Sequence, residues 1–212
     1  MNRISGIFGA IVLFFVLTGS VPAQSSNSHE FSLGVGIQFP HEKTPLNVPG
    51  DKALPSTVTG NAAYRVYLSE LVAVGVRGTI TSMKLGTYLI VQGVSSAVTK
   101  ADFSLSAMNA GLETQIYMTS RGHIRPYLSL QILYAEQNLT SSTVGNLKGQ
   151  GYLAGGGPGA RLKVSESVLV SAEVLYLAGS AEWKQKPFNN SSGTEFDPSN
   201  LRAQLNICFL IQ

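Results

Sequence analysis

The chain has 212 residues, and only 13% of them are charged, about half of the roughly 25% usual in soluble domains. Fifteen Lys and Arg against twelve Asp and Glu give a net charge of +3, which excludes the strongly basic surface of a nucleic-acid-binding protein. The single cysteine, Cys208, excludes an internal disulfide and has no Cys or His partner at metal-binding spacing.

Residues 1–23 have the pattern of a secretory signal peptide. Arg3 precedes an uninterrupted apolar run, Ile7 to Leu17, and a small-residue cleavage site ends at Ala23. The alternative, a transmembrane helix, is disfavoured because this run is too short to cross a hydrocarbon core about 30 Å thick. The mature chain is predicted to begin at Gln24 and to form one domain over 24–212.

Eight later stretches alternate apolar and polar residues with the period of two that is typical of β-strands. They cover 30–39, 61–68, 71–81, 102–118, 124–135, 150–164, 168–178 and 199–211. The gaps are long at 40–60, 82–101, 136–149 and 179–198, and short at 69–70, 119–123 and 165–167. Long surface loops and tight periplasmic turns alternate in this way in outer-membrane barrels.

The uniformly apolar face of each strand indicates contact with lipid. Val72, Val74 and Val76, for example, alternate with Ala73 and Gly75. About ten residues rising ~3.3 Å each, with a tilt of about 40°, cover the roughly 25 Å apolar band of such barrels. The predicted fold is all-β, an eight-stranded antiparallel up-and-down transmembrane β-barrel with both termini in the periplasm and the long loops outside.

The polar phase of the strands places several charged side chains in the lumen. These are Arg65, Arg77, Glu113, Arg161, Glu173 and Arg202. We expect Glu113 and Glu173 to neutralise some of the arginines. Interior pairs of this kind favour a polar plug over a pore, although a pore remains the alternative.

Aromatic residues fall near the two predicted membrane interfaces. Phe31 and Phe209 lie at the periplasmic end, and Phe39, Tyr134, Tyr152 and Tyr176 lie at the outer end. As a set they predict two interfacial aromatic belts. For any single residue, the general preference of Phe and Tyr for strands is an equal explanation.

The four long gaps are predicted surface loops and the candidate sites for an extracellular ligand. They are rich in Ser, Asn, Thr, Gly and Pro, as in Asn189 to Thr194. The second gap differs, because Tyr88-Leu89-Ile90-Val91 is apolar. This segment is predicted to extend the hairpin above the membrane; the alternative is a contact patch.

The glycine-rich run from Gly151 to Gly159 does not fit a phosphate-binding loop, because no Gly-Lys-Ser/Thr follows and no helix pattern begins there. Glycines on a barrel wall instead let the sheet curve and accept aromatic rings. Pro158 cannot donate a ladder hydrogen bond, so a bulge is predicted near 157–159.

The run from Gly151 to Ala160, with Arg161 to Ser165 and Ala172 to Tyr176 after it, resembles the barrel domain of the OmpA, OmpX and opacity-type outer-membrane proteins. Arg125-Pro126-Tyr127-Leu128 resembles the same family. The resemblance covers nearly all of 30–211. It implies an integral protein of the bacterial outer membrane, with outer-membrane lipid, the barrel assembly machinery and periplasmic chaperones as partners.

Some small outer-membrane barrels resemble this chain and act on lipids through His, Ser and a carboxylate, but its three histidines argue against catalysis. His29 lies at the mature N-terminus and His123 in a predicted periplasmic turn, which leaves His41 beside Glu42. No catalytic residue, cofactor or metal is therefore expected.

The leading hypothesis is a non-enzymatic outer-membrane protein whose loops serve interaction, adhesion or envelope stability. The alternative is a narrow pore or small-ligand carrier. A soluble carrier of lipocalin type would need the two strand faces reversed.

Cleavage after Ala23 is the testable consequence of the N-terminal pattern. N-terminal sequencing of membrane-extracted protein should start at Gln24. A mature protein that retains Ile7 to Leu17 would contradict the assignment.

Overall fold

The computed structural model describes residues 28–41, 55–92, 97–120, 122–141, 145–184 and 195–211, and it describes side chains in these ranges except over 86–101. The predicted signal peptide and the start of the mature chain at Gln24 lie outside the described residues.

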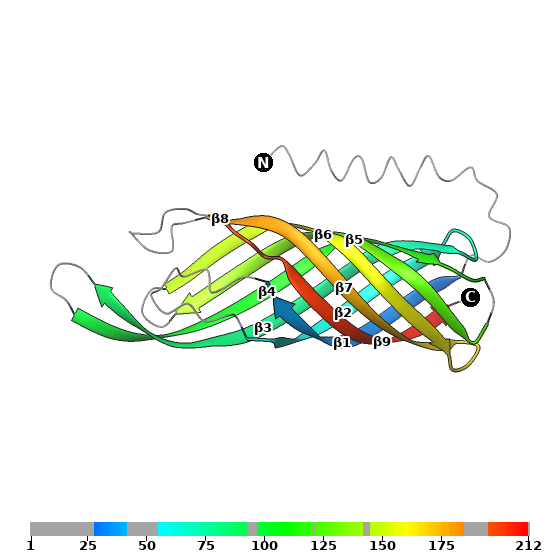
Figure 1. Ribbon diagram of the computed structural model, residues 1–212, viewed down its shortest axis with the longest axis horizontal. Helices are drawn as coiled ribbons and strands as arrows, with labels where there is room; N and C mark the ends of the chain where they lie inside the picture. Colours follow the sequence, from blue (N-terminus) through cyan, green and yellow to red (C-terminus); the bar gives the residue numbers. More distant parts are fainter. Residues whose placement is uncertain are drawn as a thin grey trace.

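Eight long antiparallel strands close into a barrel, which confirms the predicted fold class (Figure 1). The strands are β1 His29–Pro40, β2 Thr57–Tyr67, β3 Val72–Gln92, β4 Ala97–Tyr117, β5 Ile124–Ser141, β6 Gly145–Lys163, β7 Val168–Trp183 and β9 Asn200–Ile211. A two-residue strand, β8 (Glu195–Phe196), pairs with the outer end of β7.

Pairing between the first and last strands closes the barrel. The ladder runs from His29 opposite Ile211 to Pro40 opposite Asn200, and every other long strand pairs with its neighbours in sequence. Closure gives each backbone group on these edges a partner, which a lipid environment requires. The start of β1 and the end of β9 lie at the end of the barrel that carries the short turns (Figure 1).

The alternating sequence pattern sorts the side chains as predicted, apolar residues outward and most polar residues inward. Leu205 on β9 is 60% exposed, whereas its neighbour Gln204 is 3% exposed. The exposed large apolar side chains come from all eight long strands and form the outer wall. Within the described residues no helix is long and apolar enough to cross a membrane.

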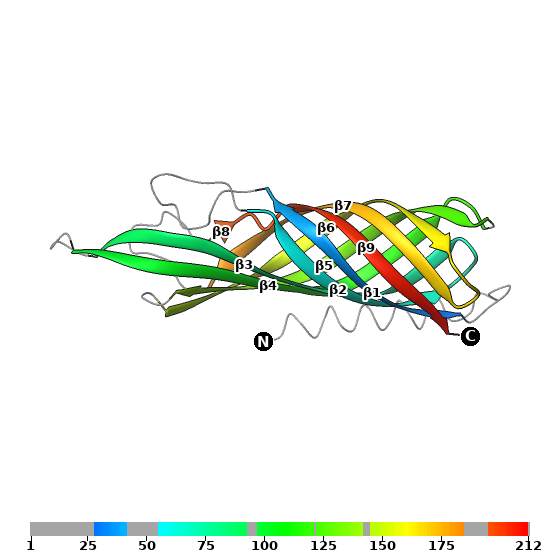
Figure 2. The same ribbon diagram turned by 90° about the horizontal axis from the view of Figure 1, so that it is seen from below.

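The strands extend beyond their predicted outer ends. β3 and β4 continue to Gln92 and from Ala97, so the predicted hairpin extension is confirmed and the gap at 82–101 is mostly strand (Figure 2). The predicted boundaries of the other long gaps were also wrong: β2 begins at Thr57, β5 ends at Ser141, β6 begins at Gly145 and β7 ends at Trp183. Backbone pairing can continue where the outward face no longer lies in lipid, so the lipid-facing pattern could not mark these ends.

The predicted bulge near 157–159 is wrong. The β6–β7 ladder keeps one register on both sides of this position, with Gly156 opposite Tyr176 and Gly159 opposite Glu173. It is interrupted between these two pairs without a shift. On the other side, Pro158 pairs with Leu128 in an unbroken register. The missing N–H of Pro158 therefore leaves a gap in the ladder and does not insert an extra residue. The β3–β4 register shifts elsewhere, between Lys84 and Gly86.

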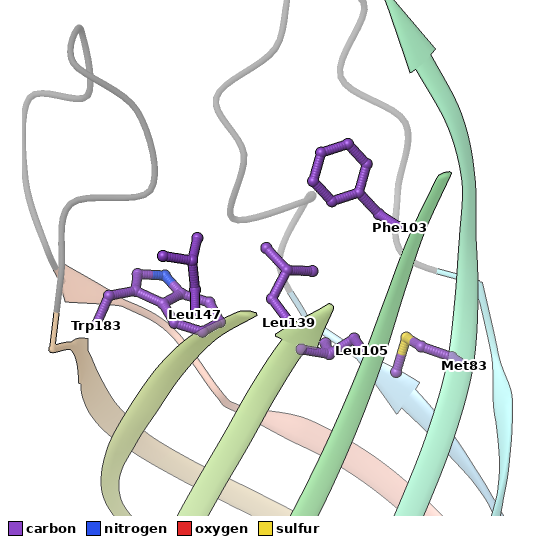
Figure 3. Packing of buried hydrophobic residues seen from close by; sticks show 6 residues of the cluster. All are labelled: Met83, Phe103, Leu105, Leu139, Leu147 and Trp183. Atoms are coloured by element: carbon purple, nitrogen blue, oxygen red, sulfur yellow. The ribbon is translucent and has the colours of Figure 1, made fainter. Parts of the chain in front are cut away.

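The barrel interior has three parts along its axis. Toward the short turns lies a group of tyrosines, Tyr67, Tyr117 and Tyr127 with Ala73. Charged and amide side chains follow. The outer part holds two apolar clusters, an inner leucine cluster and a mouth cluster, and Figure 3 shows the mouth cluster. The inner leucine cluster is Leu133, Ala135, Leu153 and Leu177, and the mouth cluster is Met83, Phe103, Leu105, Leu139, Leu147 and Trp183.

The prediction of a polar lumen thus holds for the middle of the barrel, and in its outer part inward apolar side chains lie together with polar ones such as Gln38, Thr57 and Thr59. Leu177, for example, is fully buried on the inward face of β7. Where several strands each carry an inward apolar side chain at the same depth of the lumen, these side chains pack against one another.

The outer wall generates a depth-dependent prediction. Leu205 lies in the middle of β9, so Leu205→Arg should lower the free energy of unfolding by about 2–4 kcal/mol in a refolding titration in lipid vesicles. Val164 is an exposed residue in the turn after β6, and Val164→Arg should cost about 0–1 kcal/mol. Equal losses would show that the apolar wall does not lie in lipid.

Candidate functional site

A chain of alternating charges crosses the middle of the lumen. Its order is Arg161, Glu30, Arg65, Glu113, Arg77 and Glu173, and it is called the ion chain below. The N–O distances in that order are 2.6, 2.5, 3.0, 3.0 and 2.5 Å. Each glutamate except the last is shared by two arginines. With three arginines and three glutamates, the ion chain is electrically neutral.

The ion chain connects six strands. Arg161 comes from β6, Glu30 from β1, Arg65 from β2 and Glu113 from β4. Arg77 on β3 then reaches Glu173 on β7, on a strand that does not pair with its own. All six side chains are at most 2% exposed, so each charge depends on its protein partners for stabilisation.

Neutral groups complete the coordination of Glu30 and Glu113. Tyr67 Oη donates to Glu30 Oε2 at 2.6 Å. Gln115 Nε2 donates to Glu113 Oε1 at 2.8 Å, and Ser129 Oγ donates to the same oxygen at 3.2 Å. Charge-assisted hydrogen bonds of this kind are about twice as strong as neutral ones. The ion chain is therefore supported by hydrogen bonds as well as by opposite charge.

The tyrosines cover the turn-side end of the ion chain. The Arg161 guanidinium lies 5.1 Å from the centre of the Tyr117 ring and also donates to Tyr67 Oη. The Tyr127 ring fits against Gly159, where a Cβ would lie 2.4 Å from the ring carbon Cζ. This glycine accepts an aromatic ring, as the glycine-rich sequence of β6 predicts.

Arg202 is the one predicted lumen charge that the structure leaves outside the ion chain. It is fully buried, and its Nε donates to Asn200 Oδ1 at 2.8 Å while Nη1 donates to Thr79 Oγ1 at 3.2 Å. The other five predicted residues lie together in the ion chain.

The sequence interpretation did not include Glu30 of the ion chain or the three tyrosines beside it among the site residues. Glu30 is the first residue of the predicted strand 30–39, two positions before Ser32 on the same face. Extending the alternation by one position, from Ser32 back to Glu30, would have found it. Tyr67, Tyr117 and Tyr127 lie on the inward phase of their strands, and the same period of two identifies their side chains as inward-facing.

The predicted belt residues all lie on the outer wall. Phe31 pairs with Phe209 near the short turns, and Tyr134 makes an edge contact with Tyr152 at 5.7 Å between ring centres. Phe39 and Tyr176 are exposed as well. Their role as interfacial belts stays a prediction.

The histidines lie apart from one another. His29 Nδ1 is 2.5 Å from Tyr64 Oη on the turn side of the wall, His123 lies in the turn before β5, and His41 is exposed at the outer end of β1. Glu42 lies outside the described residues. Within the described ranges, no three His, Cys, Asp or Glu side chains are grouped to hold a metal.

Solved structures of outer-membrane barrels are similar to this chain. OprG of Pseudomonas aeruginosa matches with a TM-score of 0.58 and 12% identity, over 91% of this chain and 100% of its own. The N-terminal β-barrel domain of OprF from the same organism matches with 0.48 and 15% identity, over 89% and 100%. Ail, the attachment invasion locus protein of Yersinia pestis, matches with 0.47 and 11%, over 88% and 100%.

At this identity the similarity establishes the fold alone, and OprG is the one of these three above a TM-score of 0.5. No protein-family model matches the sequence, and no curated protein matches it. The closed antiparallel barrel, its apolar outer wall and its polar, charge-paired middle satisfy the requirements of a strand-built membrane protein. The chain has the fold of small eight-stranded outer-membrane barrels, and its apolar outer wall has the character of a surface that lies in lipid.

Proposed function

We propose that this is a non-enzymatic outer-membrane protein with a closed lumen, whose barrel holds outward-facing hairpins and loops for interaction, adhesion or envelope stability. The observation that carries the proposal is the ion chain. Its three arginines and three glutamates pair with one another across the lumen, at most 2% exposed.

A barrel of eight strands has an interior just wide enough for side chains to fill. Here the long side chains of Arg65, Arg77 and Arg161 occupy its middle, and the carboxylates hold them there. An ion crossing the lumen would have to break these pairs. Charge pairing in this place therefore supports a plug and an anchor over a conducting pore.

The outer hairpins provide the surface for a partner. β3 and β4 run far beyond the other strands on the side opposite the short turns (Figure 1). Hairpins and loops on a rigid scaffold commonly carry binding functions. Outer-membrane lipid surrounds the wall, and an extracellular ligand would meet the ranges 40–60, 82–101, 136–149 and 179–198.

The mouth cluster favours a second candidate, a carrier of a small apolar ligand. Its apolar side chains lie inside the outer end of the barrel and point toward one another (Figure 3). Trp183 is 3% exposed, and its Nε1 has no hydrogen-bond partner among the described residues. A cluster of this composition either closes the mouth or receives an apolar molecule.

Glu113→Gln tests the ion chain, because Glu113 is the carboxylate that joins Arg65 to Arg77. Two buried arginines would lose a counter-charge, so the free energy of unfolding should fall by about 3–5 kcal/mol in a refolding titration. Glu166→Gln, in the exposed turn after β6, is the control and should change stability by no more than about 0.5 kcal/mol. Similar small effects of both changes would mean that water, and not protein, solvates the lumen charges.

Conductance tests the closed lumen. The purified wild-type protein in planar lipid bilayers should show no sustained current steps, because the ion chain blocks the path. The Glu113→Gln variant should show transient openings if it folds. Steady, large conductance of the wild type would contradict the proposal and support a pore.

Trp183 distinguishes the two states of the mouth cluster, because it is the only tryptophan of the chain. If the cluster closes the mouth, acrylamide in the aqueous phase should quench its fluorescence weakly in the wild type and more strongly in Leu139→Ala. Strong quenching of the wild type would show an open, accessible mouth and favour the carrier.

A further inference from the structure

Arg202 is a buried cation without a counter-charge in the described part of the chain. The five ion pairs of the lumen involve the other three arginines, and the two acceptors that Arg202 does bind, on Asn200 and Thr79, are neutral. A buried guanidinium without a negative partner strongly destabilises the folded state. A compensating negative charge would remove this cost.

Arg77 lies beside Arg202. Arg77 Nη1 reaches from β3 to Gln204 Oε1 on β9 at 2.9 Å, and Arg202 Nη1 reaches back from β9 to Thr79 on β3. The two contacts are separated by two residues on each strand, which is about 7 Å. Two guanidinium groups therefore bridge the same pair of strands side by side.

Three N–H donors around this pair have no hydrogen-bond partner among the described residues. They are Nη2 of Arg202, Nη2 of Arg77 and Nε2 of Gln204. All three residues are at most 3% exposed. Unsatisfied buried donors next to an unpaired positive charge are the recognition elements of an anion.

We propose that Arg202, Arg77 and Gln204 form a binding site for a small inorganic anion of the size of chloride. A bound water molecule could satisfy the donors, but it would leave the charge of Arg202 uncompensated. A small ion is required because the middle of the lumen is filled and is bounded on the outer side by the inner leucine cluster. The site does not depend on what the surface loops bind.

The experiment measures folding against chloride at constant ionic strength, with gluconate as the bulky replacement anion. One site that binds only the folded state makes the folding equilibrium constant rise in proportion to chloride once chloride exceeds its dissociation constant. For the wild type we expect about a tenfold rise in the equilibrium constant for a tenfold rise in chloride in this range. No dependence on chloride would overturn the site.

A built-in carboxylate provides the sharper test. Gln38 on β1 is the register partner of Arg202 and is buried, so Gln38→Glu places a negative charge next to the guanidinium with almost no change in shape. This variant should be more stable than the wild type in gluconate and should lose the chloride dependence. Gln150→Glu, on the exposed face of β6, is the matched control and should keep it.

Arg202→Gln removes the proposed charge itself and should abolish the chloride dependence. If this variant does not fold, the Gln38→Glu comparison still decides the question. Chloride dependence that persists unchanged in Gln38→Glu would show that the effect arises elsewhere and would overturn the proposal. Bromide soaked into crystals of the wild type should give an anomalous peak beside Arg202, and its absence there would count equally against the site.

Discussion

Shared carboxylates in the lumen are the constraint on which the rest of this barrel depends. A strand that shows an apolar face to lipid must turn its other face inward, and here that face carries arginines. A buried arginine is strongly destabilising unless a negative group lies beside it, and Glu30 and Glu113 each serve two arginines. The ion chain therefore links six strands that the backbone ladder connects only to their neighbours.

The division of the interior into a charged middle and an apolar outer part has a functional consequence. In the proposed function, the paired side chains of the charged middle close the lumen, and the apolar clusters pack in its outer part. Both features rigidify the base of the long hairpins. A rigid, closed base is what a protein needs if its function lies in the segments that it holds outside the membrane.

The sequence was sufficient for the strands, for their inward and outward faces and for five of the six residues of the ion chain, because a period of two assigns each side chain to one side. It could not assign the pairs. Arg77 and Glu173 are 96 residues apart, and only the closure of the barrel brings them together. The alternation did not predict the leucine cluster of the outer lumen, because it assigns each side chain to a face and does not show which side chains of neighbouring strands lie at the same depth.

Local chemistry explains the remaining differences. Pro158 lost its ladder bond without forcing a bulge, because the strands on both sides kept their register. The hairpin of β3 and β4 extends beyond the residues that alternate in the lipid-facing pattern, because backbone hydrogen bonds between the strands also form outside lipid. The sequence places Arg202 in the lumen with three other arginines but does not say which of them the carboxylates neutralise, and the isolation of Arg202 from these carboxylates is the feature that points to an anion.

The most direct test of the ion chain is a double-mutant cycle between Arg77 and Glu173, which lie on strands that do not pair. Each single change, Arg77→Gln or Glu173→Gln, leaves the other buried charge without this partner, whereas the double change removes both charges. Refolding titrations should give an interaction energy of at least about 1 kcal/mol, with the double variant less destabilised than the sum of the single variants. Additive losses would contradict a direct ion pair across the lumen, and with it the claim that paired charges hold this barrel closed.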